Sequence, residues 1–257
     1  MKSRTRKIFP PVFMFLVYAF IYIPILILII FSFNESRLNV VWTGFTLDWY
    51  GKLMKNHEVI RALINTVKVA FATTIISTVI GTLTAVGMYR YKFKGKVVLD
   101  NLLYIPMVIP EIVLGIALLI FFNKTNIPLG LWTLIIAHST FCIPFVVITV
   151  KSRMAGFDKA QEEAAMDLGA GQFKTFIYIT LPNILPGVIA GALLSFTLSL
   201  DDVITSFFVA GPRSTTLPLQ IFSMVKFGVS PEINALSTLM LLTSLTLALL
   251  SEKFKTK

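Results

Sequence analysis

Cysteine, histidine and charged residues are all scarce in this 257-residue chain. The single cysteine, Cys142, excludes an intrachain disulfide. Neither of the two histidines has a second ligand type beside it at metal-site spacing, so no metal site is expected. Charged residues make up 14% of the chain, against roughly 25% in globular domains, while apolar residues reach 56%. These shortages exclude a disordered chain, a disulfide-stabilised secreted domain and a cytosolic enzyme.

Long apolar runs take the place of the missing charges. Six runs have about the 20 residues that a helix needs to cross a membrane, and lipid offers the backbone no hydrogen-bond partner outside its own helix. We therefore predict an all-α integral membrane protein that forms one transmembrane domain over 1–257. The predicted transmembrane helices are 11–33, 62–88, 99–122, 130–150, 184–209 and 231–251. The first follows a basic segment but lacks a small-residue cleavage site, so we expect an uncleaved anchor.

The basic residues fall unevenly between the two sides of this layout. Four lie before the first run, four in 89–98, four in 151–183 and three in the C-terminal tail, fifteen in all, against seven in the other connections. The positive-inside rule places the richer side in the cytoplasm, so both termini are predicted inside (N-in/C-in). The net charge of +10 is therefore interpreted as contact with lipid headgroups and as a topology signal, not as nucleic-acid binding.

The cytoplasmic segment 151–183 is longer than a simple connection. Asp158 and Gln161 have the spacing of a helix N-cap signal, and Gly169 is placed to end that helix. A second amphipathic helix is predicted to end at Pro182, because proline cannot continue the hydrogen-bond ladder. On physical grounds alone, two helices joined at a glycine suit either a docking site for a soluble partner or a simple interfacial hairpin.

A motif lies in the same segment. Glu163-Ala164-Ala165, Gly169, Ile179 and Leu181-Pro182 match the pattern E-A-A-x₃-G-x₉-I-x-L-P, which resembles the signature of the permease subunits of binding-protein-dependent ABC importers. The resemblance implies the type I importer permease fold and makes 151–183 a coupling loop, whose helix sits in a groove of the ATP-binding subunit. Within it, Glu163 would be a polar anchor, Ala164 would permit close approach and Gly169 would form the bend.

Other stretches of the chain resemble one particular group within this importer family. The stretches 140–145, 195–202 and 229–235 are similar to those of spermidine/putrescine importers, and in particular to the second of their two permease subunits. The feature that points to polyamines is Ser199-Leu200-Asp201-Asp202. This resemblance implies translocation of polyamines across the bacterial inner membrane by alternating access.

The chain lacks the phosphate-binding loop G-x-x-x-x-G-K-[ST]. Its two Gly-Lys pairs, at 51–52 and 95–96, are followed by Leu53 and Val97. We therefore expect no enzyme and no cofactor on this chain, with ATP and Mg²⁺ bound by a partner. The resemblance implies three kinds of partner besides membrane lipids: a second permease subunit, a dimeric ABC ATPase and an extracytoplasmic polyamine-binding protein.

Three acids in the predicted transmembrane helices are candidates for the solute pathway, since a carboxylate in a membrane costs about 2.5–3.5 kcal/mol and usually serves a function. Glu111, Asp201 and Asp202 would bind ammonium groups, Ser199 would replace water, and Trp49 would offer an aromatic face at the entrance. Adjacent helix positions differ by about 100°. Asp201 and Asp202 therefore face one point only if the helix breaks there; otherwise one of them pairs or caps.

Two alternatives stay open at this point. The same importer family handles other solutes, so thiamine, iron, sulfate or a sugar would also fit the coupling loop, although an anion pathway would favour Arg and helix N-termini over three acids. An ion-coupled secondary transporter or channel would use the acids as proton relays, but it leaves the loop 151–183 without a role.

Overall fold

The computed structural model describes residues 5–36, 41–226 and 228–255, and these are overwhelmingly helical. Strand pairing within these ranges is limited to one isolated bridge between Asn34 and Phe45. The prediction of an all-α protein is confirmed. Lys2, Arg4, Arg37 and Lys257, which contribute to the predicted orientation, lie outside the described residues.

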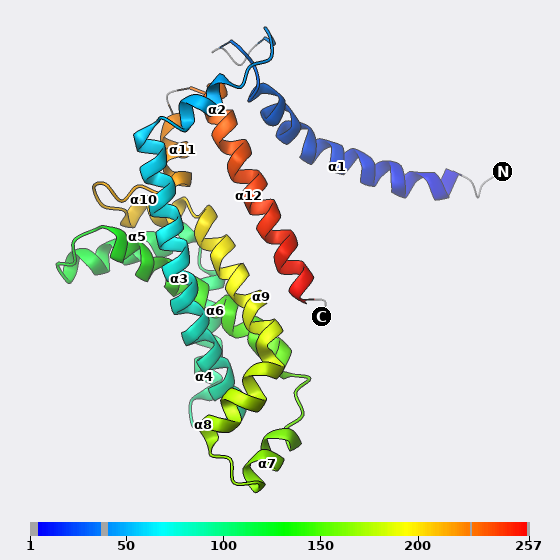
Figure 1. Cartoon of the computed structure of the whole chain (residues 1–257), viewed down its shortest axis with the longest axis vertical. Helices are drawn as coiled ribbons and strands as arrows, with labels where there is room; N and C mark the ends of the chain where they lie inside the picture. Colours follow the sequence, from blue (N-terminus) through cyan, green and yellow to red (C-terminus); the bar gives the residue numbers. More distant parts are fainter. Residues whose placement is uncertain (1–4, 37–40, 227, 256–257) are drawn as a thin grey trace. The chain divides into compact units, whose positions relative to one another are not determined.

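The helices follow one another along the chain as labelled in Figure 1. They are α1 (Thr5–Phe31), α2 (Asp48–Leu53), α3 (His57–Arg90), α4 (Lys96–Val108), α5 (Glu111–Lys124), α6 (Leu131–Met154), α7 (Ala160–Asp167), α8 (Gln172–Thr175), the π-helical segment η1 (Phe176–Thr180), α9 (Leu181–Asp201), α10 (Ile204–Val209), α11 (Leu217–Val225) and α12 (Pro231–Lys255).

The chain divides into two compact units. Unit 1 comprises Met1–Ile60 and Ile221–Leu242, and unit 2 comprises Arg61–Gln220 and Thr243–Lys257. In unit 1 the chain before α2 folds around the buried Asn34. Its side-chain amide donates to the carbonyl of Val41 (2.9 Å), and its side-chain oxygen accepts from the backbone N–H of Thr43 (3.0 Å).

Unit 2 has α6 at its centre, packed along α9. The sequence of α6 is apolar on all sides, which is typical of a helix surrounded by protein. Its buried side chains join two clusters of apolar residues. One cluster contains Ala85, Val86, Val146, Val147, Val150, Met154 and Ile184, and the other contains Val69, Phe122, Leu134, Ile135, Ala137 and Val209.

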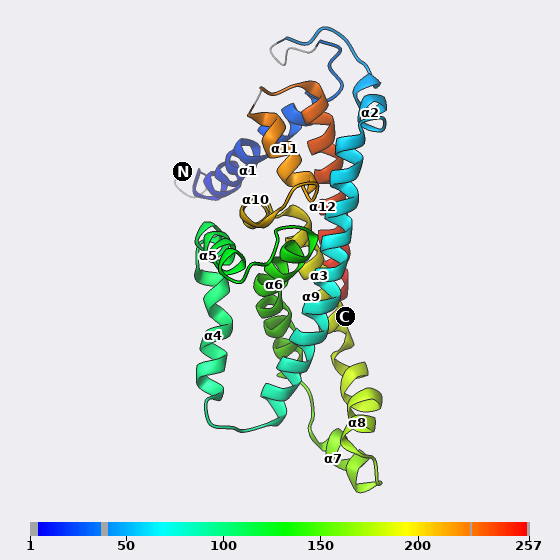
Figure 2. The same ribbon diagram turned by 90° about the vertical axis from the view of Figure 1, so that its left-hand side faces the viewer.

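The predicted helix over 99–122 is not continuous. It consists of α4 and α5, which meet at a bend of 106° (Figure 2). Proline explains the break: Pro110 has no N–H to donate, and Ile109 before it is extended (φ −66°, ψ 132°), as residues before proline prefer. The predicted transmembrane segment 99–122 is therefore a pair of helices that bend at Pro110.

The predicted helix over 184–209 is interrupted as well. It consists of α9 and α10, separated by Asp202 and Val203, and Asp202 is extended (φ −66°, ψ 126°). In the described residues, four helices are long and apolar enough to cross a membrane, or five if α4 and α5 together count as one. A multi-pass membrane chain is thus established, whereas the count of six and the orientation remain predictions.

The connection after α10 places Gly211 against the chain that precedes α6. A Cβ built on Gly211 would lie 1.9 Å from the carbonyl oxygen of Leu129 and 2.9 Å from the nitrogen of Gly130.

Because these are backbone atoms, the substitution Gly211→Ala is expected to destabilise the fold by about 1–3 kcal/mol. Thermal unfolding of the detergent-solubilised protein measures this loss. The matched control is Gly156→Ala, whose new Cβ meets nothing within 4 Å, and an equal melting temperature for the two variants would contradict the prediction.

Candidate functional site

Glu111, Asp201 and Asp202 line one pocket of about 390 Å³ in unit 2. Glu111 is the first residue of α5, Asp201 is the last residue of α9, and Asp202 stands in the break before α10. The two helix breaks therefore bring together acids that are 90 positions apart in the sequence. Apolar and aromatic side chains complete the wall, including Met107, Leu114, Phe141, Phe145 and Val203.

Glu111 and Asp201 are the accessible acids of this pocket. Both side chains are exposed. Glu111 makes no hydrogen bond or ion pair with any residue that the structure describes, and its place in the first turn of α5 puts it at the positive end of the helix dipole. Asp201 accepts one hydrogen bond, from the hydroxyl of Ser244 on α12 (2.8 Å). Two carboxylates are therefore available to a cationic solute.

Asp202 is engaged within the protein, and its side chain is only 5% exposed. Its carboxylate accepts from the backbone N–H groups of Ser206 (2.7 Å) and Thr205 (3.3 Å), which belong to the first turn of α10. These contacts satisfy N–H groups that would otherwise lack partners at the start of a helix. Asp202 thus holds the break between α9 and α10 in place.

His138 packs against Asp202 from α6, whereas from the sequence it was considered only as a metal ligand and assigned no role. The imidazole is fully buried, with Nε2 3.3 Å from the carboxylate of Asp202 and 3.0 Å from the hydroxyl of Ser206. Its Nδ1 lies 2.7 Å from the hydroxyl of Ser199. An ionisable side chain in an apolar helix was the available signal, but its partners are 61 to 68 positions away.

Ser199 and Trp49 do not lie in the pocket wall. Ser199 is buried against His138, so it reaches the acids only through that ring. Trp49 belongs to unit 1, where its indole N–H donates to the carbonyl of Asn34 (2.8 Å) and the ammonium of Lys52 lies 4.2 Å from its ring centroid. One face of the tryptophan is therefore already covered by a cation of the same chain.

The motif in 151–183 forms a short helix with a glycine end. α7 closes with a bond from the N–H of Gly169 to the carbonyl of Met166 (2.9 Å) and one from the N–H of Ala170 to the carbonyl of Ala165 (3.0 Å). This pair of hydrogen bonds is a Schellman motif, which requires a left-handed φ at the residue after the helix; Gly169 has φ +87°. The predicted end of the helix at Gly169 is confirmed.

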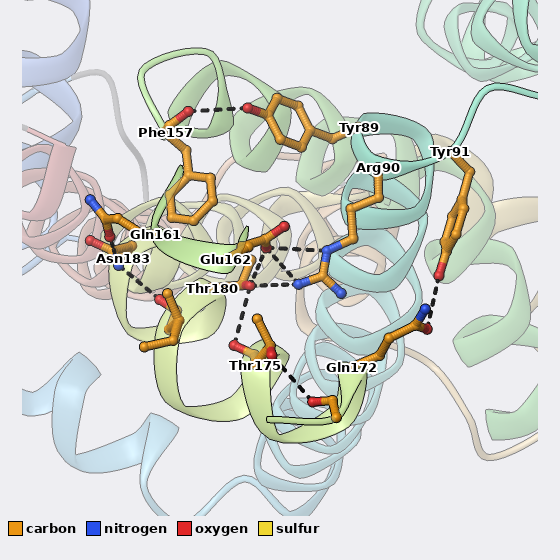
Figure 3. A network of polar contacts seen from close by, with 12 residues as sticks. Tyr89, Arg90, Tyr91, Phe157, Gln161, Glu162, Gln172, Thr175, Thr180 and Asn183 are labelled. Carbon is orange, nitrogen blue, oxygen red and sulfur yellow. Dashed lines mark hydrogen bonds and ion pairs between the residues drawn. The ribbon is translucent and has the colours of Figure 1, made fainter. Parts of the chain in front are cut away.

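We call α7, the turn at Gly169 and α8 together the elbow. The motif residues lie on its outside. Glu163, Ala164 and Gly169 are all exposed, as are the apolar side chains of Leu168 (90%) and Phe173 (77%) that flank them. Two large apolar side chains left in solvent beside a helix end indicate a contact surface. The acid next to Glu163 behaves differently: Glu162 is buried and pairs with Arg90 and Thr180 (Figure 3).

Pro182 does not end the second helix of the elbow, contrary to the prediction. The chain runs helically from Gln172 to Asp201, through α8, η1 and α9. A wide π-helical turn stands directly before the proline, and such turns absorb an interruption of the normal ladder. The elbow and the acidic pocket are therefore the two ends of one helical segment.

The chain is similar to known transport proteins. The family described as "binding-protein-dependent transport system inner membrane component" matches residues 77–254. The spermidine/putrescine transport system permease protein PotC is 49% identical in Haemophilus influenzae, over 93% of both chains, and 50% identical in Escherichia coli K12, over 93% of this chain and 91% of that one. The putrescine transport system permease protein PotI of Escherichia coli K12 is 41% identical, over 90% and 84%.

Solved structures show the same fold at low sequence identity. A chain of a bacterial ABC transporter that imports the acidic polysaccharide alginate has a TM-score of 0.77 at 16% identity, covering 98% of both chains. A chain of the MetNI methionine ABC transporter has a TM-score of 0.65 at 18% identity, covering 76% of this chain and 93% of that one. Together with the curated relatives, these matches establish that the chain belongs to the family of binding-protein-dependent transport system inner membrane components.

Proposed function

We propose that this chain is a transmembrane subunit of an ATP-driven importer that moves spermidine and putrescine across the bacterial inner membrane by alternating access. The observation that carries the proposal is the pocket lined by Glu111, Asp201 and Asp202, in a chain about half identical to a spermidine/putrescine permease. The polyamine assignment for this chain rests on that likeness and on the charge of the pocket.

The chemistry of the solute matches the pocket. Polyamines are multivalent cations at neutral pH, with ammonium groups separated by flexible apolar segments. Glu111 and Asp201 supply accessible carboxylates for charge-assisted hydrogen bonds, and the rings of Phe141 and Phe145 offer faces for cation–π contact. A divalent anion such as sulfate would be repelled by these carboxylates.

The remaining predicted pathway residues receive different roles. Asp202 and, through His138, Ser199 keep the α9–α10 break in shape, so that Asp201 faces the pocket. Trp49 is proposed to meet the solute at the outer entrance, where Lys52 leaves its ring when a solute cation takes that place. Each role is a proposal about the transport cycle.

The coupling surface is the elbow around α7. We place Glu163, Ala164 and Gly169 in a groove of the ATPase subunit, with the exposed Leu168 and Phe173 as apolar contacts. ATP and Mg²⁺ are bound by that dimeric ATPase. The working complex also needs a second permease subunit and an extracytoplasmic polyamine-binding protein, with this chain crossing the membrane six times and both termini in the cytoplasm.

Uptake of labelled spermidine tests the assignment. The chain is expressed with its neighbouring transport genes in cells that lack their own polyamine uptake, and unlabelled putrescine, thiamine and sulfate compete in turn. We expect uptake that only putrescine and spermidine reduce, and that requires ATP. Competition by thiamine, or uptake that persists without ATP and collapses with the proton gradient, would support the alternatives instead.

A further inference from the structure

A largely buried charged cluster lies beneath the exposed elbow, and the motif does not account for it. Its members are Arg90, Glu162 and Thr180 (Figure 3). Arg90 donates from Nη2 to Oε1 of Glu162 (2.5 Å) and from Nε to the same oxygen (3.2 Å). The same Nη2 donates to the hydroxyl of Thr180 (2.6 Å), and that hydroxyl donates in turn to Oε1 of Glu162.

Each member of the cluster comes from a different segment. Arg90 is the last residue of α3, Glu162 lies in the first turn of α7, and Thr180 is the last residue of η1, directly before α9. One carboxylate oxygen therefore receives bonds from two other segments. Charge-assisted hydrogen bonds of this kind are roughly twice as strong as neutral ones.

Glu162 is also the only buried residue of α7. Most short helices are held by an apolar face, but α7 has no buried apolar side chain, and its inward anchor is an acid that is 7% exposed. The other bonds from this region are neutral and mostly exposed, such as Tyr91 to Gln172 (3.4 Å) and Asn183 to Gln161 (3.2 Å). The charged cluster is therefore the main side-chain attachment of α7 to the rest of unit 2.

We propose that Arg90, Glu162 and Thr180 form the joint that carries a displacement of α7 to α3 and α9 together. Glu162 is its positioning residue, and the proposal rests on the proposed importer function. A push on α7 acts on Arg90 at the end of α3 and on Thr180 directly before α9, whose far end is Asp201. The elbow then cannot move without moving the helix that carries the pocket acid.

The test uses the complete importer, reconstituted in liposomes with its partner permease, ATPase and binding protein. Spermidine uptake and ATP hydrolysis are measured side by side for wild type, Glu162→Gln and Arg90→Gln. We expect spermidine taken up per ATP, and the stimulation of hydrolysis by loaded binding protein, to fall about tenfold while basal hydrolysis and subunit composition stay unchanged. The exchange of both charges, Arg90→Glu with Glu162→Arg, is expected to restore part of the ratio.

Two further variants separate coupling from folding. Tyr91→Phe is the matched control, because it removes a neutral bond between neighbouring parts of the same segments, and it should keep the wild-type ratio. Thr180→Val weakens the joint without leaving a buried charge unpaired, and it should lower the ratio about threefold. If the charge variants fail to assemble, Thr180→Val decides whether the joint couples ATP hydrolysis to uptake.

An unchanged ratio in Glu162→Gln or Thr180→Val would overturn the proposal, as would a fall in uptake that only follows the amount of assembled complex. A wild-type complex that ignores spermidine contradicts the polyamine function instead. The joint is then judged by the stimulation of ATP hydrolysis alone, which the binding protein triggers whatever its solute is.

Discussion

Asp201→Asn is expected to lower the rate of spermidine uptake about tenfold while leaving the importer assembled. Asp201 is exposed in the acidic pocket, and its only bond in the described structure comes from Ser244. Asparagine keeps the shape of the side chain and can still accept that bond, so the fold should tolerate it. What disappears is a charged partner for an ammonium group, and hydrogen bonds to charged groups contribute about 1.5–3 kcal/mol.

The neighbouring acid, Asp202, is expected to give a different result when it is replaced. Asp202→Ala removes the acceptor of two backbone N–H groups at the start of α10 and takes from His138 its buried carboxylate partner. Loss of a helix cap alone costs about 1 kcal/mol. Asp202→Ala should therefore reduce the amount and the melting temperature of the complex, whereas Asp201→Asn should reduce uptake per assembled complex.

The measurement is initial uptake rate against spermidine concentration, normalised to assembled complex by pull-down of the ATPase. Asp48→Asn serves as the control, because Asp48 is an exposed acid of α2 that does not line the pocket. Wild-type uptake by Asp201→Asn, or an equal loss in Asp48→Asn, would remove Asp201 from the pathway.

The sequence was sufficient to nominate the pocket acids, and for a physical reason. A carboxylate in an apolar helix is costly, so its presence marks a use. The roles of Asp201 and Asp202 could not be assigned in the same way, because they depend on where the helix breaks. Nothing local requires a break at Asp202: no proline or glycine stands there, and its carboxylate is held by contacts with α10 and with His138 of α6.

In the elbow, too, features with a local cause could be predicted from the sequence, and features that depend on distant residues could not. Gly169 was predicted to end the helix because glycine is frequent directly after a helix C-terminus, and its φ is +87°. Pro182 was wrongly predicted to end the helix, since the π-helical turn that accommodates it has no local sequence signal. Glu162 escaped notice because burial follows from Arg90, 72 positions away.

Gly169→Pro is expected to abolish coupling between ATP hydrolysis and uptake. Proline fixes φ near −65° and lacks an N–H, whereas position 169 has φ +87° and donates to the carbonyl of Met166. The Schellman end of α7 cannot form, and the exposed Glu163, Ala164 and Leu168 lose their arrangement. A proline that opposes the helix geometry costs about 3 kcal/mol, which corresponds to about a hundredfold fall in uptake.

Gly171→Pro is the matched control for this experiment. Gly171 lies two residues further on with φ −70°, which proline adopts without strain, and its N–H donates to no backbone carbonyl among the described residues. Both variants are expressed with the full set of subunits, and ATPase retention and spermidine uptake are compared. The first should lose uptake and bind the ATPase weakly, and the second should resemble wild type. Equal uptake by the two would mean that the left-handed bend is dispensable, and the coupling surface would then have to be sought elsewhere than at the C-terminal end of α7.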